Sequence, residues 1–400
     1  MNRSVLLVLA VVLFLFLNVQ ATKAIASPVQ YELHQPPAII LFIGDGMGEA
    51  QREAGSWFSV GQDGQLNMET LPVSGWSITS NISGTITDSA AAATAMATGE
   101  KTLNGRISVD ISGISLPTIL EQAQEQGWST GLVSNVQITH ATPAAFASHE
   151  INRTNTITIA EQILDHKVNV LLAGGEDDWF PETETGCYPN PGHRIDGRNL
   201  IAEAIAGGYT YICEGEDLAI LDFENETQVL GLFADDGMLR PYTPTLTMMT
   251  TVAIEILSRD PDGFFLMVEG GQIDWAAHMN DGGNVITDVL GIDSAIAQAL
   301  DYASINPNTL IIVTGDHETG GMSADLVSSG QPDEDGPFLM PDGTPFYINW
   351  TTIYHTGVDV PVMAFGPKSE FLIGTYENTH IYEVMRRFLG WQVNLPLIHR

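Results

Sequence analysis

The chain has 400 residues, 44% of them hydrophobic, which is enough for one large domain or two smaller ones with a buried core. Its 49 acidic residues outnumber 15 Lys and Arg, and the formal net charge is −34. With so few basic residues, the chain has no positively charged patch that could hold a nucleic-acid backbone. The composition therefore excludes binding of DNA or RNA as a polymer.

The first 26 residues have the pattern of a secretory signal peptide. Arg3 precedes an almost continuous apolar run over residues 5–19, and Ala24-Ile25-Ala26 has the small-x-small form of a cleavage site. About 15 apolar residues are short for a membrane span of about 20, which disfavours the alternative of an uncleaved anchor. We therefore expect a signal peptide over 1–26, a periplasmic or extracellular location, no stable membrane anchor after cleavage, and a single domain over 27–400.

Apolar, β-branched runs that end in Gly or Asp alternate with helical patterns along the rest of the chain. The runs that predict strands are 38–43, 129–133, 168–172, 263–268, 309–313 and 360–365. The patterns that predict helices are 116–126, 198–206, 246–259 and 285–303. Strands that are apolar throughout and alternate with helices indicate a mainly parallel sheet covered on both faces. The expected fold is therefore α/β, a three-layer α/β/α sandwich around a large, mainly parallel central sheet.

Two segments rich in Pro, Gly and acidic residues, 176–197 and 328–349, interrupt this pattern. We expect both to be surface excursions rather than sheet elements or separate domains. Cys187 lies in the first, and Cys213 follows in the same irregular region. In an exported chain the two are expected to form a disulfide, and two free buried thiols are the alternative.

Acidic residues and histidines cluster where the expected strands end, which is where parallel sheets bind their ligands. They are Asp45, Glu269, Asp274, His278, Asp316 and His317, with His355 just before the last strand. Each is weak evidence alone, but together unpaired acids at one rim would repel one another, and cations remove that cost. Mixed His/Asp sets suit zinc, and all-oxygen sets suit magnesium. The remaining histidines are expected to be structural or exposed: His34, His149, His166, His193, His380 and His399.

The stretch "TDSAAAATAMATG", residues 87–99, predicts a helix because alanine is the strongest helix former. Thr87, Asp88 and Ser89 fall in its N-terminal cap region, where the helix dipole favours anions such as phosphate. The plain alternative is that Ser89 or Asp88 only caps the helix. No G-x-S-x-G turn surrounds the serine, and the histidines at the strand ends are better explained as metal ligands than as members of a catalytic triad.

Six motifs carry a specific family resemblance. "IGDGMG", "TDSAAAATAMATG", "HATPAAFASHEINR", "VEGGQIDWAAH", "VTGDHETGG" and "HTG" resemble the successive motifs of alkaline phosphatases, in family order. The resemblance extends from about Ile40 to Pro367 and is weak in the two excursions.

The resemblance implies hydrolysis of phosphate monoesters to an alcohol and inorganic phosphate, through a phosphoserine formed on Ser89. Arg153 matches the arginine that grips the phosphate. Two zinc ions and one magnesium ion are implied. The ligands of one zinc would be Asp274, His278 and His355. Those of the second would be Asp45, Asp316 and His317, and the magnesium would be shared by Asp45, Thr142 and Glu269. The family also implies a homodimer.

Two positions vary within the family near the third metal. Some members carry Asp at the position of His140, and some carry Lys or His at that of Trp275. The pair found here removes one carboxylate and one cation from the site. We therefore expect magnesium to be held less rigidly, partly through waters, with His140 as a direct or water-bridged ligand. Trp275 is expected either in the core or at the rim of the site.

Three other functions fit the sequence less well. A sulfatase needs a C-x-P-x-R segment, and Cys187-Tyr188-Pro189 begins such a segment but no arginine follows at the required position. A related phosphodiesterase usually has a threonine nucleophile and no equivalent of Arg153. A non-catalytic scavenger of metal or phosphate would not need the nucleophile and the complete ligand set.

Overall fold

The computed structural model describes residues 35–390, and the expected signal segment over 1–26 lies outside them. Within residues 35–390, helices that could cross a membrane are absent, because none is both long and apolar enough.

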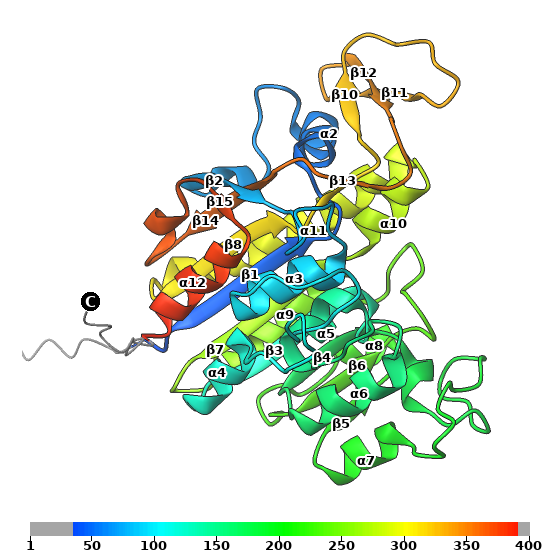
Figure 1. Cartoon of the computed structure of the whole chain (residues 1–400), viewed down its shortest axis with the longest axis vertical. Coiled ribbons are helices and arrows are strands. Elements are labelled where there is room, and N and C mark those ends of the chain that lie inside the picture. The colour runs from blue at the N-terminus through cyan, green and yellow to red at the C-terminus, as the bar shows by residue number, and fades with distance from the viewer. Residues whose placement is uncertain (1–34, 391–400) are drawn as a thin grey trace, which may run out of the picture. The chain divides into compact units, whose positions relative to one another are not determined.

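A ten-stranded sheet forms the centre of the described chain, with the order β15-β2-β14-β8-β1-β7-β3-β4-β6-β5 (Figure 1). The strands are β1 (Ala38–Gly44), β2 (Val73–Ile78), β3 (Ser129–Gln137), β4 (Val170–Gly174), β5 (Thr210–Ile212), β6 (Val229–Leu232), β7 (Phe264–Gly270), β8 (Thr309–Gly315), β14 (Val360–Phe365) and β15 (Gly374–Glu377). From β8 to β5 all neighbours are parallel. Each of the six expected strands is present, which confirms the predicted mainly parallel sheet.

Strand β14 is the exception that matters for the site. It runs antiparallel to both β8 and β2, with Val362 beside Thr314 and Phe365 beside Ile311. Its first residues therefore lie at the carboxyl end of β8. His355, which precedes β14, is brought by this reversal to the same rim as the residues that follow β1, β7 and β8.

Helices cover both faces of the sheet, as predicted (Figure 1). Alternate residues of β1 supply the two cores, with Ile40 and Phe42 in one and Ile39 and Leu41 in the other. The first core is covered by α2 (Glu49–Val60), α8 (Gly215–Ala219), α9 (Leu246–Leu257), α10 (Gln272–His278) and α11 (Gly282–Ile305). The second is covered by α3 (Ser89–Thr98), α4 (Ile119–Glu125), α5 (Ala141–Ala147), α6 (Thr156–Asp165), α7 (Leu200–Ala206) and α12 (Thr379–Phe388).

The excursion over 176–197 begins with the buried 3₁₀ turn Glu176–Trp179 and continues as irregular chain. Cys187 and Cys213 form a disulfide, which confirms the expected pairing. The bond fastens this irregular segment to the end of β5.

The expectation for residues 328–349 was wrong in one respect, because they do form strands. Strands β11 (Asp335–Leu339) and β12 (Pro345–Asn349) pair with β10 (Ser323–Asp325) in a separate antiparallel sheet (Figure 1). Phe346 gives the physical reason: its buried ring packs edge-on against Trp57 of α2, with ring centroids 5.7 Å apart. Buried apolar residues, Phe346 with Met340 and Ile348, thus order a segment whose composition is that of a loop.

Candidate active site

The predicted site residues meet at the carboxyl edge of the central strands. Asp45 follows β1, Glu269 lies near the end of β7, and Asp316 with His317 follows β8. The two-stranded pair of β9 (Glu318–Thr319) and β13 (His355–Thr356) fixes His355 beside them. The sheet topology therefore explains why residues up to 310 positions apart share one site.

Asp274, His278 and His355 form the first cluster. Asp274 Oδ2 lies 3.3 Å from His278 Nε2, and its Oδ1 lies 3.6 Å from His355 Nε2. The helical spacing of Asp274 and His278 on α10 puts both on one face, as expected. The two Nε2 atoms are 3.2 Å apart.

Backbone carbonyls fix the orientation of both imidazoles in this cluster. His278 Nδ1 lies 2.6 Å from the Ile353 carbonyl oxygen, and His355 Nδ1 lies 2.9 Å from that of Thr87. A carbonyl oxygen only accepts hydrogen bonds, so each Nδ1 carries a proton and donates it. This leaves Nε2 of both rings facing Asp274, so the three side chains form a donor set that suits a cation.

The second cluster, Asp45, Asp316 and His317, is almost completely buried. His317 Nε2 lies 3.5 Å from Asp45 Oδ1 and 3.3 Å from Asp316 Oδ2. Asp316 is held by its other oxygen, Oδ1, which accepts from the backbone N–H groups of Gly46 and His317 at 3.0 and 2.8 Å. These turns position the carboxylate before any ligand arrives.

Thr319 joins the two clusters, although its sequence position did not single it out. Its hydroxyl donates to Asp274 Oδ1 and lies 3.3 Å from His317 Nδ1. Since the one hydroxyl proton goes to Asp274, the oxygen accepts from His317 Nδ1–H, and Nε2 is left bare toward Asp45 and Asp316. Thr319 belongs to the motif "VTGDHETGG", so only proximity to His317 in sequence hinted at this role.

The third group is Asp45, Glu269 and His140, and Thr142 follows His140 by two residues. Glu269 is fully buried and accepts from Ser134 Oγ, while its Oε1 lies 3.4 Å from His140 Nδ1. Asp45 Oδ2 lies 3.9 Å from the same nitrogen. Thr142 is buried near the start of α5. Trp275 packs edge-on against His140, with ring centroids 6.3 Å apart, so it lies at the rim of the site.

Ser89 is the first residue of α3, and Asp88 is its N-cap. Ser89 Oγ lies 3.4 Å from Asp45 Oδ1 and 3.4 Å from His317 Nε2. The capping alternative therefore holds for Asp88, whose Oδ1 accepts from Ala91 N at 3.0 Å. The serine hydroxyl faces the second cluster instead.

Arg153 reaches the site from the chain after α5 and is held on both sides. Its Nη1 donates to Asp88 Oδ2 at 3.1 Å, and its Nη2 lies 3.1 Å from His140 Nε2. Because guanidinium only donates, His140 Nε2 accepts, and Nδ1 carries the proton that faces Glu269. The sequence pointed to Arg153 and Asp88 separately but gave no sign of their contact, which spans 65 positions.

The electrostatics of these clusters fit cations. Asp45 Oδ2, Asp316 Oδ2 and Thr142 Oγ1 are buried and, within the described residues, have no hydrogen-bond partner. Burial and the neighbouring carboxylates raise the pKa of Asp45 well above its usual range. Burial, with the charge of Asp274, raises the pKa of Asp316 to about 8. Oxygens and nitrogens that face one another without donors are the donor sets of metal ions.

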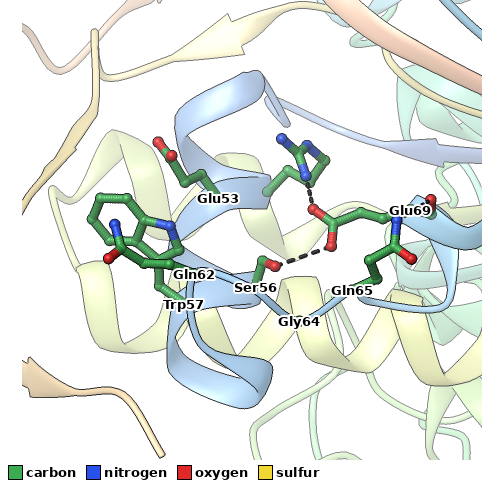
Figure 2. A pocket seen from close by; sticks show the side chains of 8 residues that line it. Glu53, Ser56, Trp57, Gln62, Gly64, Gln65 and Glu69 are labelled. Atoms are coloured by element: carbon green, nitrogen blue, oxygen red, sulfur yellow. Dashed lines mark hydrogen bonds and ion pairs between the residues drawn. The ribbon is translucent and has the colours of Figure 1, made fainter. Parts of the chain in front are cut away.

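A separate hollow lies on α2 (Figure 2). Two of its charged groups pair with each other, since Glu69 contacts Arg52, and Glu69 also accepts from Ser56 Oγ at 3.0 Å. None of the rim residues named above lines this hollow. Its lining comprises Arg52, Glu53, Ser56, Trp57, Gln62, Gly64, Gln65 and Glu69.

Sequence comparisons with known proteins all point to the same family. The sequence profile of the family described as "Alkaline phosphatase" matches residues 37–333 and 344–391. Alkaline phosphatase 3 of Bacillus subtilis is 33% identical, over 89% of this chain and 90% of that protein. Streptomycin-6-phosphate phosphatase of Streptomyces griseus is also 33% identical, over 94% of this chain and 95% of that protein.

Solved structures agree with the sequences. The alkaline phosphatase of the Antarctic bacterium TAB5 superposes with a TM-score of 0.77 at 31% identity, over 89% of this chain and 99% of that one. A His-to-Asp variant of the TAB5 enzyme, described with Mg bound in its M3 site, gives 0.76 at 31% identity, over 90% of this chain and 99% of that one. With a rim of carboxylates, imidazoles and a serine already in place, these matches show that the chain belongs to the alkaline phosphatase family, whose members are metal-dependent hydrolases of phosphate monoesters.

Proposed function

We propose that this phosphatase works through Ser89 as its nucleophile. The observation that carries the proposal is the position of Ser89 Oγ, 3.4 Å from both Asp45 Oδ1 and His317 Nε2, at the positive end of α3. A phosphate placed there would contact both the N-terminus of α3 and the guanidinium of Arg153.

We infer two zinc sites and one magnesium site from the donor sets. Asp274, His278 and His355 would hold one zinc, and Asp45, Asp316 and His317 the other, since nitrogen and carboxylate ligands suit zinc. Bound there, the ions would supply the positive charge that activates a hydroxyl nucleophile and stabilises a departing oxygen.

Magnesium would take the oxygens of Asp45, Thr142 and Glu269, because it prefers oxygen ligands. His140 Nδ1 carries a proton as long as Arg153 donates to Nε2. That orientation favours an indirect role for His140, as a hydrogen-bond donor to Glu269 or to a water beside the ion, over direct coordination.

The chain's own residues would then act in two steps. Ser89 Oγ forms a bond to phosphorus as the bond to the ester oxygen breaks, and the alcohol leaves. A water then cleaves the phosphoserine, releasing inorganic phosphate and restoring the hydroxyl. Arg153 supplies two parallel N–H donors for phosphate oxygens, and Asp88 holds it in that orientation beforehand.

Replacing Ser89 tests the proposal directly. Ser89→Ala is expected to lower kcat for p-nitrophenyl phosphate at alkaline pH on the order of 10³-fold or more, because no other hydroxyl takes its place. Ser294→Ala, at an exposed serine of α11, is the matched control and should keep full activity. Retention of full activity by Ser89→Ala would show that the nucleophile is another group.

Metal removal and alternative substrates complete the test. Chelation is expected to abolish hydrolysis, and zinc with magnesium to restore it. Faster hydrolysis of bis-p-nitrophenyl phosphate or p-nitrophenyl sulfate would favour the phosphodiesterase or sulfatase function instead.

We also propose that the chain is exported to the periplasm or the extracellular space and forms a homodimer. The disulfide between Cys187 and Cys213 supports export, because such bonds persist in oxidising compartments. Cell fractionation with N-terminal sequencing should find a mature chain that begins near Ser27, and light scattering should give twice the chain mass.

A further inference from the structure

Outside the active site, a further group of side chains of the kinds that bind metals lies at the opposite end of α5 from His140. Glu121 of α4, His149 after α5 and His166 at the end of α6 come together there. Glu121 Oε1 lies 3.0 Å from His149 Nε2 and 3.3 Å from His166 Nε2. Both histidines were expected to be structural or exposed, and their approach to one carboxylate oxygen is a finding of the fold.

Each side chain of the group makes a second hydrogen bond, to the backbone, that fixes its orientation. His149 Nδ1 lies 2.9 Å from the Ser108 carbonyl oxygen, and His166 Nδ1 lies 2.9 Å from that of Ala147. The second oxygen of Glu121 accepts from Thr118 N at 2.7 Å, in the capping box of α4. Carbonyl-bound imidazoles and a hydrogen-bonded carboxylate are the outer shell that metal ligands usually have.

The directions of these hydrogen bonds leave too few donors between the two imidazoles and Glu121. The carbonyls require a proton on both Nδ1 atoms, so each neutral ring turns the bare Nε2 toward a carboxylate oxygen that has lone pairs only. One proton can satisfy one imidazole, and a second would place two like charges on rings whose centroids are 5.8 Å apart.

The titration behaviour follows the same asymmetry. Burial opposes protonation of His149, but its hydrogen bonds to Glu121 and to the Ser108 carbonyl, with the charge of Glu121, together outweigh burial and raise its pKa. Burial and the charge of His149 lower the pKa of His166. When both rings are neutral, Nε2 of His149 and Nε2 of His166 face Glu121 Oε1 at 3.0 and 3.3 Å with no proton between them.

We propose that Glu121, His149 and His166 bind a zinc ion outside the active site. Two ligand atoms on a tetrahedral zinc are about 3.3 Å apart, since each lies about 2.0–2.1 Å from the ion, and the observed separations of 3.0 and 3.3 Å match this. Two imidazole nitrogens disfavour magnesium and calcium.

The surroundings leave room for a fourth ligand and access for the ion. The side chains of Glu121, His149 and His166 are 23, 15 and 25% exposed, and they line a cavity of about 530 Å³. A water from this cavity would complete the tetrahedron. The ion would tie α4 and the end of α6 to the chain that follows α5.

Metal content tests the site independently of the active-site ions. Wild type, His166→Gln and the control His380→Gln are stripped with chelator, dialysed at pH 8 against buffered zinc, and analysed by elemental mass spectrometry. The proposal requires one zinc per chain fewer in His166→Gln, with hydrolysis of p-nitrophenyl phosphate retained. His166→Asp, which restores a ligand, should recover the ion. Equal zinc in wild type, His166→Gln and His380→Gln would overturn the proposal.

A measurement on the unaltered chain covers a failure of the variants to fold. Diethyl pyrocarbonate modification is followed by peptide mass spectrometry with and without zinc. At zinc about 100 times Kd, nearly all sites are filled, and modification of His149 and His166 should slow at least about tenfold. His380 should react at an unchanged rate. Unchanged rates at His149 and His166 would also overturn the proposal.

Discussion

Single hydrogen bonds decide which nitrogen of each active-site histidine faces the cations. Thr319 does this for His317, because its only proton goes to Asp274 and its oxygen is left to accept from Nδ1. Thr319→Val keeps the shape and removes both contacts, so zinc affinity is expected to fall about 10- to 100-fold. Competition with a chromophoric chelator measures this.

The control for that change is Thr250→Val on α9, where the buried hydroxyl has no hydrogen-bond partner among the described residues. It should leave zinc affinity unaltered. If Thr319→Val binds zinc as tightly as wild type, the orientation of His317 has another cause.

In His140, unlike His317, the nitrogen that carries the proton faces the carboxylate, here Glu269. His140→Asp would put an oxygen ligand beside Asp45 and Glu269, and magnesium affinity is expected to rise about tenfold. The half-saturating magnesium concentration of the zinc-loaded enzyme measures the change. His140→Gln, which adds no charge, should not show the rise, and a rise in both variants would mean that carboxylate charge is not the cause.

At the scale of elements, α3 and the segment after α5 are joined through Asp88. It caps α3 through Ala91 N and holds Arg153 Nη1 at 3.1 Å. Asp88→Ala loses both functions, so the free energy of unfolding should drop by about 0.5–2 kcal/mol. Asp88→Asn keeps the cap but loses the charge and the Oδ2 acceptor of Arg153 Nη1 and Gly105 N, so its free energy of unfolding should drop less than that of Asp88→Ala.

Both Asp88 variants leave Arg153 less ordered before phosphate binds. Inhibition by inorganic phosphate is therefore expected to weaken about three- to tenfold in each, because ordering the guanidinium then costs binding energy. Equal loss of stability in the two variants would contradict the division of the two roles.

The central strands could be predicted because they are apolar on both faces, and the ligands could be predicted because they directly follow those strands. Strand β15 at one edge of the sheet and its neighbour β2 could not, since "GTYE" and "VSGWSI" are short and partly exposed. Contacts such as Arg153 with Asp88, or Glu121 with His149 and His166, depend on how helices pack. Sequence supplied the residue types there, and tertiary structure supplied their partners.

For the whole molecule, with its net charge of −34, loss of bound cations increases electrostatic repulsion and lowers the free energy of unfolding. At the rim, burial and neighbouring carboxylates raise the pKa of Asp45, and burial with the charge of Asp274 raises that of Asp316 to about 8. Without metal, the folded chain keeps protons on these carboxyls that the unfolded chain releases at much lower pH. Its stability must therefore decrease as pH rises toward 8.

Between pH 7 and 8 His317 opposes this decrease only weakly, because burial lowers its pKa and the unfolded imidazole, with a pKa of about 6.5, has lost about three-quarters or more of its proton there. The thermal midpoint of the chelator-stripped enzyme is therefore expected to fall by several degrees over this window. Bound metal replaces the protons, and its affinity grows with pH because the ligands must be deprotonated. Calorimetry of stripped and metal-loaded enzyme should thus show a gap in midpoint that widens with pH, and a constant gap would mean that these carboxyls do not govern the stability of the metal-free state.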